Sequence, residues 1–142
     1  MPLPRVIPAL LASLLFLSAC AASGPAYSPA AKRELGMLKG RSVRLMEKAE
    51  QPYEEHTKAA NTLMQQLAAA REAAQGRVGN GTAVAQWNLM LDAEGHLVGG
   101  FLSRWQADTT LRPAFIAQAI DLVEASFAAM EAFELAKIGA PK

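Results

Sequence analysis

Apolar positions recur at spacings of three and four residues in several long segments of the chain, which is the period of an amphipathic helix. The clearest case is a predicted helix over residues 113–138, which begins at Pro113 in its first turn and stops at Gly139 and Pro141. The stripe expected to face the core consists of Ile116, Ile120, Val123, Phe127, Met130 and Phe133 or Glu134. The charged residues expected on the outer side are Asp121, Glu124, Glu131 and Glu134.

Two further helices are predicted earlier in the chain. The first runs from about Ser28 to about Gln51, with Pro29 as a first-turn proline and a basic outer side. Pro52 then interrupts the chain, and an alanine-rich second helix follows to about residue 75. The glycine-rich residues 76–81 predict a turn, in which Gly76 is expected to adopt the left-handed conformation that ends many helices.

The segment between residues 82 and 106 permits two interpretations. Its apolar positions, which include Trp87 and Trp105, form a helical stripe that predicts two helical pieces, residues 82–93 and 96–106, separated near Gly95. Thr82 is the expected N-cap, and both tryptophans are expected to face the core. A short β-hairpin around residues 87–99 remains the alternative, because residues 91–98 also fit two short strands around a turn.

Four amphipathic segments joined by short connections predict an all-α fold, namely an antiparallel bundle of about four helices. The bundle domain is expected to comprise residues 32–142. Its first helix is basic on the outside and its last is acidic, so the two are expected either to be neighbours or to present oppositely charged faces.

A different pattern precedes the bundle. Arg5 is followed by an apolar run over residues 6–16, which is too short to span a bilayer, since that takes roughly 20 residues. The run ends in small residues, as a cleavage site does, and leads into Leu17-Ser18-Ala19-Cys20. This stretch resembles the signal peptide of bacterial lipoproteins, whose lipobox is a leucine, two small residues and a cysteine.

The resemblance implies that residues 1–19 are a signal peptide, that the Cys20 sulfur carries a diacylglyceryl group and that the mature chain begins there. Because Ala21, and not aspartate, follows the cysteine, it also implies the periplasmic face of the outer membrane in a Gram-negative host. Residues 20–31 are then the lipidated cysteine and a flexible tether. The alternative is an ordinary cleaved signal peptide with a free cysteine.

Charge and cysteine content exclude several classes of function. The chain has 14 basic and 13 acidic residues, and only Arg5 among them precedes Cys20. A mature net charge near zero argues against a nucleic-acid partner. Since Cys20 is the only cysteine, neither a disulfide nor a thiolate zinc site is expected.

Residues with obvious chemistry are sparse. Neither His56 nor His96 follows a glutamate in the Glu-x-x-His spacing of di-iron bundles, and no serine lies in a Gly-x-Ser-x-Gly setting. Asp92, Glu94 and His96 are close in sequence, but nothing marks them as more than a polar turn. We therefore predict no enzyme activity, catalytic residue, metal site or cofactor. The alternative is a small haem- or metal-binding bundle that uses a histidine with a methionine.

The remaining candidate is the glycine-rich stretch between the two tryptophans. Glycines beside aromatic residues allow close backbone approach, either in a tightly packed helix break or in a groove for a peptide, a lipid tail or a partner helix. The predicted groove residues are Trp87, Leu91, Gly95, Gly99, Phe101 and Trp105. The sequence thus predicts a lipid-anchored, periplasm-facing envelope lipoprotein with a non-enzymatic binding or scaffolding role, whose partner is another envelope protein or an amphipathic ligand.

Overall fold

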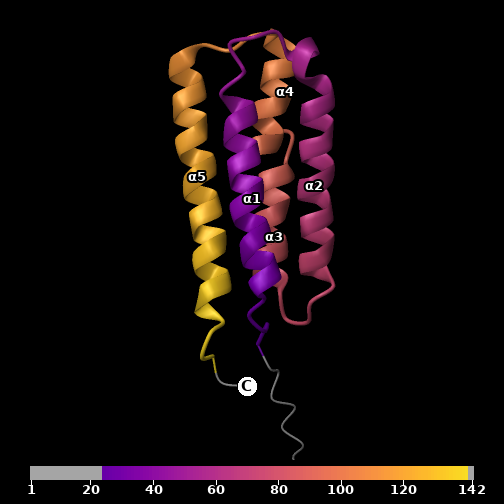
Figure 1. Cartoon of the computed structure of the whole chain (residues 1–142), viewed down its shortest axis with the longest axis vertical. Coiled ribbons are helices and arrows are strands. Elements are labelled where there is room, and N and C mark those ends of the chain that lie inside the picture. Colours follow the sequence, from indigo (N-terminus) through magenta and orange to yellow (C-terminus); the bar gives the residue numbers. More distant parts are fainter. Residues whose placement is uncertain (1–23, 141–142) are drawn as a thin grey trace, which may run out of the picture.

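The computed structural model describes residues 24–140, and within that range every regular element is a helix (Figure 1). The predicted lipobox and signal peptide lie outside the described residues. The elements are, in chain order, α1 (Pro29–Met46), the 3-10 turn η1 (Tyr53–His56), α2 (Thr57–Gln75), α3 (Gly81–Leu91), α4 (Val98–Asp108) and α5 (Pro113–Ala136).

The chain runs up and down the molecule, so that neighbouring helices are antiparallel (Figure 1). α1 packs against α2 and α5, and α3 also packs against α2 and α5. α3 and α4 follow one another along the third position of the bundle. The predicted all-α antiparallel bundle is therefore confirmed. The start of α1, the α2–α3 turn and the end of α5 all lie at its lower end in Figure 1.

α1 begins where the sequence predicts. Ser28 is the N-cap and its side chain accepts a hydrogen bond from the Ala31 N–H at 3.1 Å, while Pro29 occupies the first turn. The flexible tether expected over residues 20–31 is therefore wrong for its last three residues, which form the first turn of α1.

α1 ends at Met46, earlier than the predicted Gln51. The segment between Met46 and Pro52 is instead held by hydrogen bonds from α4 and from the α4–α5 connection. The Leu111 N–H donates to the Ala49 carbonyl at 2.7 Å, and the Trp105 indole N–H donates to the Gln51 carbonyl at 2.9 Å. The chain after Met46 therefore tightens into turns that lead to Pro52.

The turn after α2 differs in detail from the prediction. Gly76 has a right-handed conformation, with φ −68°, whereas Gly79 has a positive φ of 73°. Asn80 replaces the predicted Thr82 as the residue before α3, and its side-chain amide donates to the Ala74 carbonyl at 3.0 Å. The Asn80 side chain thus supplies a hydrogen bond to a carbonyl group at the end of α2. The residue with the left-handed conformation is Gly79, three residues after Gly76.

The break predicted near Gly95 is confirmed, and the β-hairpin alternative is wrong, because residues 92–97 connect two helices and contain no strand. Two glycines explain the tight connection. A Cβ atom on Gly99 would lie 2.3 Å from the Leu91 carbonyl oxygen, and one on Gly100 would lie 1.8 Å from the Gly95 carbonyl oxygen. Only glycine allows the start of α4 to pack so closely against the end of α3.

The apolar stripe of α5 faces the core as predicted. Ile116, Val123, Phe127 and Met130 are buried, and Gly139 ends the segment with a positive φ of 80°. Both tryptophans are buried, as expected from the helical stripe: Trp87 is 4 % exposed and Trp105 is 0 % exposed.

The charged faces of α1 and α5 also meet. The Lys39 ammonium lies 3.1 Å from a carboxylate oxygen of Glu131, so the basic and acidic helices are neighbours. Glu134 was predicted both as the last position of the core stripe and as an outer carboxylate, and the structure places it in the stripe. It is only 3 % exposed, and it lies against Arg77 from the α2–α3 turn and Lys137 at the end of its own helix.

Candidate functional site

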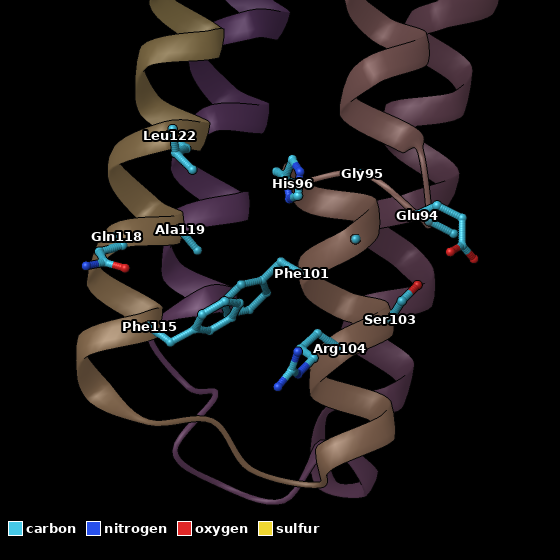
Figure 2. Close-up of a pocket in the computed structure, with 12 residues that line it drawn as sticks. Glu94, Gly95, His96, Phe101, Ser103, Arg104, Phe115, Gln118, Ala119 and Leu122 are labelled. Carbon is cyan, nitrogen blue, oxygen red and sulfur yellow. The ribbon is translucent and has the colours of Figure 1, made fainter.

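A groove of about 500 Å³ lies between α4 and α5, and we call it the α4–α5 groove (Figure 2). It exists because α4 packs closely on α3 and η1 but does not follow α5 along its length. Its volume is within the range of roughly 300–1,000 Å³ that is typical of ligand pockets. The lining residues are Ala93, Glu94, Gly95, His96, Gly100, Phe101, Ser103, Arg104, Phe115, Gln118, Ala119 and Leu122.

Two phenylalanines meet across the α4–α5 groove (Figure 2). The rings of Phe101 from α4 and Phe115 from α5 are nearly parallel, at 7°, with their centroids 6.0 Å apart. Phe101 is buried, whereas Phe115 is 36 % exposed. The Arg104 guanidinium lies 5.9 Å from the centre of the Phe115 ring, within the range of a cation–π contact. One end of the groove is therefore formed by two aromatic rings, with the Arg104 guanidinium beside them.

The polar side chains of the groove lie mainly at its rim. Arg104 also forms an ion pair with Asp108, one turn further along α4. His96 is exposed at the start of α4, and Figure 2 shows Glu94 pointing away from α5. Leu122 is 53 % exposed and lies on the α5 side. The groove thus combines an apolar wall with a few polar groups at its edge, an arrangement suited to an amphipathic ligand.

The structure brings two of the six predicted groove residues, Gly95 and Phe101, to this groove. The other four lie elsewhere. Trp87 packs edge-on against Phe127 in the core, with ring centroids 6.2 Å apart. Trp105 packs edge-on against Tyr53, with ring centroids 5.3 Å apart, and both tryptophans are buried in the core. The two remaining residues, Leu91 and Gly99, pack at the junction of α3 and α4.

Sequence reasoning missed the α5 side of the groove. Phe115, Ala119 and Leu122 contribute this wall. Phe115 and Leu122 are large apolar residues that fall outside the core stripe of their own helix, and that mismatch is the feature that could have identified them.

The two histidines occupy different surroundings. His56 Nε2 lies 2.6 Å from the Gln51 side-chain oxygen, and its ring lies 5.3 Å from that of Trp105. His96 lines the α4–α5 groove, whose lining includes no methionine. Within residues 24–140, no three or more His, Cys, Asp or Glu side chains are grouped so that they could hold a metal ion.

A second polar site lies at the lower end of the bundle, and we call it the Glu134 cluster. One carboxylate oxygen of Glu134 accepts from the Ser28 N–H at 2.7 Å and from Arg77 Nη2 at 3.0 Å. The other accepts from Lys137 Nζ at 2.5 Å, and the same ammonium donates to the Asn80 side-chain oxygen at 2.7 Å. The cluster therefore joins the start of α1, the α2–α3 turn and the end of α5.

The surroundings of Glu134 hold its carboxyl group in the ionised form. Burial by itself raises the pKa of this group, but the hydrogen bonds from Lys137, Ser28 and Arg77 together lower the pKa below the ordinary value of 4.5. At neutral pH the cluster contains two cations and one carboxylate, so it carries an excess positive charge.

The fold and the groove together define an up-and-down helical bundle with an open lateral groove between its third and fourth positions. Comparison of the chain with protein-family models, with curated proteins and with solved structures found no match.

Proposed function

We propose that this protein is a lipid-anchored envelope lipoprotein that faces the periplasm and acts by binding, not by catalysis. The stretch Leu17-Ser18-Ala19-Cys20 supports the anchor, and Ala21 supports an outer-membrane location in a Gram-negative host. The observation that carries the binding role is the α4–α5 groove. Its occupant is an amphipathic ligand or an apolar segment of another envelope protein.

Exposed apolar surface in the groove supports a binding role. Leu122 and Phe115 remain 53 % and 36 % exposed, although a closer approach of α4 to α5 would cover them. That approach is opposed by contacts at both ends of α4. Gly100 packs against the Gly95 carbonyl at one end, and the Trp105 indole is bonded to the Gln51 carbonyl at the other. The groove is therefore largely preformed, as ligand sites usually are.

The polar groups near the groove favour binding over acid–base chemistry. The Asp92 carboxylate accepts the Glu94 N–H at 3.0 Å, as in an ordinary polar turn. Glu94 and His96 both line the edge of the groove, but the Glu94 carboxylate is directed away from α5 (Figure 2). A carboxylate and a histidine must lie within hydrogen-bond reach of the same reacting group to act as an acid–base pair.

The anchor is tested by Cys20→Ser and fractionation of the cell envelope. The parent chain should sediment with the outer membrane and show the added mass of its acyl chains, because several acyl chains on one residue give stable attachment. The variant should lose both properties. An unchanged membrane fraction and an unchanged mass for the variant would show that Cys20 is not the anchor.

The groove is tested by placing a photo-crosslinking amino acid at Leu122 in the anchored protein. The matched control is the same amino acid at Leu135, which is exposed on the same helix but does not line the groove. We expect a discrete adduct from position 122, and its loss when Phe115 is replaced by glutamate. Equal adducts from both positions, or none from position 122, would contradict the groove as the binding site.

A further inference from the structure

The chain enters the bundle at the lower end in Figure 1, and two hydrogen bonds hold it there. The Ser28 N–H donates to Glu134, and Arg77 Nη2 donates to the Ala26 carbonyl at 3.2 Å. Ala26 is therefore fixed against this end of the bundle. Only five residues lie between it and Cys20, so the connection is six Cα–Cα steps long. Even fully extended, that length of chain spans at most about 20 Å.

This end of the bundle also presents apolar side chains to the surroundings. Val78, in the α2–α3 turn, is 85 % exposed, and Ile138, in the turn after α5, is 59 % exposed. The hydrogen bond between Lys137 and Asn80 holds these two turns together. Both apolar side chains therefore lie at the same end of the molecule, each next in sequence to a basic residue of the Glu134 cluster.

The two ends of the bundle differ in charge. The upper end in Figure 1 comprises residues 47–56 and the α4–α5 connection, and its exposed carboxylates outnumber its exposed basic groups. The carboxylates are Glu47, Glu50, Glu54, Glu55 and Asp108, and the basic residues are Lys48 and Arg112. The lower end has the excess positive charge of the Glu134 cluster. Anionic lipid headgroups attract basic groups and repel carboxylates, so the lower end is the one that suits a membrane surface.

We propose that the lower end of the bundle is a lipid-docking surface, at which Val78 and Ile138 enter the headgroup region of the bilayer. The inference rests on the lipid attachment at Cys20 proposed above. A tether of at most about 20 Å keeps the lower end of the bundle within that distance of the bilayer surface. The space between them is narrower than a small folded domain, whose diameter is about 30 Å. A lipid surface, and not a second protein, is therefore the occupant of this end. The bundle stands upright, with the α4–α5 groove open to the side.

The test uses the full lipidated chain in vesicles of phosphatidylethanolamine and phosphatidylglycerol. Val78→Cys introduces a thiol for a polarity-sensitive fluorophore, because the thiol of an acylated Cys20 does not react. We expect blue-shifted emission and strong quenching by nitroxide-labelled lipids at this position. The matched control is Glu54→Cys at the upper end, where we expect emission as in water and no quenching.

A second set of variants separates docking by side chains from proximity caused by the tether. The fluorophore is placed at Gln75→Cys, at the end of α2 beside the turn, and Val78 and Ile138 are both changed to serine. The docked fraction should fall about tenfold or more, because the large aliphatic side chains that held the end in the interface are gone. Leu89→Ser, which changes an exposed leucine on α3, should leave the docked fraction unchanged.

Three outcomes are distinguishable. Quenching at position 78, together with quenching at position 75 that is lost when Val78 and Ile138 are changed to serine, supports the lipid-docking surface. The lipid-docking surface is contradicted if the chain floats with the vesicles but the label at position 78 is exposed to water, or if the serine changes have no effect. Either result leaves the anchor intact. A chain that does not float with the vesicles and takes the label at Cys20 shows instead that the proposed anchor is wrong.

Discussion

Glu134 is the charged residue with the largest structural role in the described part of the chain. Its carboxylate accepts hydrogen bonds from the backbone of Ser28 and from the side chains of Arg77 and Lys137. These donors come from segments that are far apart in sequence. Because the group is buried and fully paired, removing its charge leaves two basic side chains without their partner.

We expect Glu134→Gln to destabilise the protein by about 3 kcal/mol, the scale found when one partner of a buried ion pair is removed. Urea denaturation of the described domain at neutral pH measures the change. Glu131→Gln is the matched control on the same helix. Its partner Lys39 is 36 % exposed, and an exposed pair of this kind contributes about 0–1 kcal/mol. Equal losses for the two variants would contradict the structural role of the cluster.

The lowered pKa of Glu134 also predicts a dependence on pH. Since the pKa is lower in the folded than in the unfolded state, the stabilisation is complete above the unfolded value, which is near 4.5. It is lost as the pH falls below that value and through the folded pKa. The difference in unfolding free energy between the parent and Glu134→Gln should therefore be constant near neutral pH and shrink in acid. A difference that grows in acid would show that the pKa is raised.

At the scale of the elements, the junction of α3 and α4 depends on two glycines. The backbone of α4 begins so close to residues 91–95 that a Cβ atom on Gly99 or Gly100 would overlap a carbonyl oxygen. This contact ends α3, turns the chain and places Phe101 at the floor of the α4–α5 groove. The helix break is therefore part of what keeps the groove open.

We expect Gly100→Ala to destabilise the protein by about 1–3 kcal/mol or more, because the added methyl group must push backbone atoms apart. Gly36→Ala is the matched control. It lies in α1 with no atom within 4 Å of the added Cβ, so it should stabilise the protein by about 0.5–1 kcal/mol through helix propensity. Thermal denaturation compares the two. An unchanged melting temperature for Gly100→Ala would contradict the close packing of α3 and α4 at this junction.

At the scale of the whole molecule, the helices are not equally supported. α2 lies between α1 and α3, and α1 lies between α2 and α5, whereas α4 packs closely only on α3 and η1. The bundle is therefore close-packed on three sides and open along the α4–α5 groove. An element with fewer packed neighbours opens at a lower free energy than the molecule as a whole.

Amide hydrogen exchange should therefore be faster in α4 and in residues 92–97 than in α2. Exchange followed by mass spectrometry, without ligand and at neutral pH, gives the comparison within a single sample. α2 serves as the internal reference, because it has close neighbours on both sides. Protection of α4 equal to that of α2 would show that the open side of the bundle is as rigid as the closed sides.

Residues 24–140 also show how far the pattern of the chain determines the structure. The Ser28 cap, the interruption at Pro52, the break near Gly95 and the end at Gly139 follow from the local preferences of proline, glycine and capping side chains. The course of the chain between Met46 and Pro52 does not follow from these preferences, because hydrogen bonds from Leu111 and Trp105, which lie far along the chain, hold that segment. The lipobox and the anchor at Cys20 remain predictions.

The candidate groove could be predicted only in part. The glycines and aromatic residues of the sequence predict Gly95 and Phe101 as groove residues. Periodicity alone does not tell which aromatic side chains the core covers. Trp87 and Trp105 are covered by Phe127 and Tyr53, while Phe115 and Leu122 are left open. Only the packing of distant helices makes that distinction.

The sequence by itself determined the helical class, the antiparallel order and most helix boundaries, because hydrophobic period and backbone preferences act over a few residues. The tertiary structure decided which side of α5 lines a groove, why Glu134 is buried and which end of the bundle holds Ala26. These features depend on contacts between segments that the pattern of a single helix does not encode.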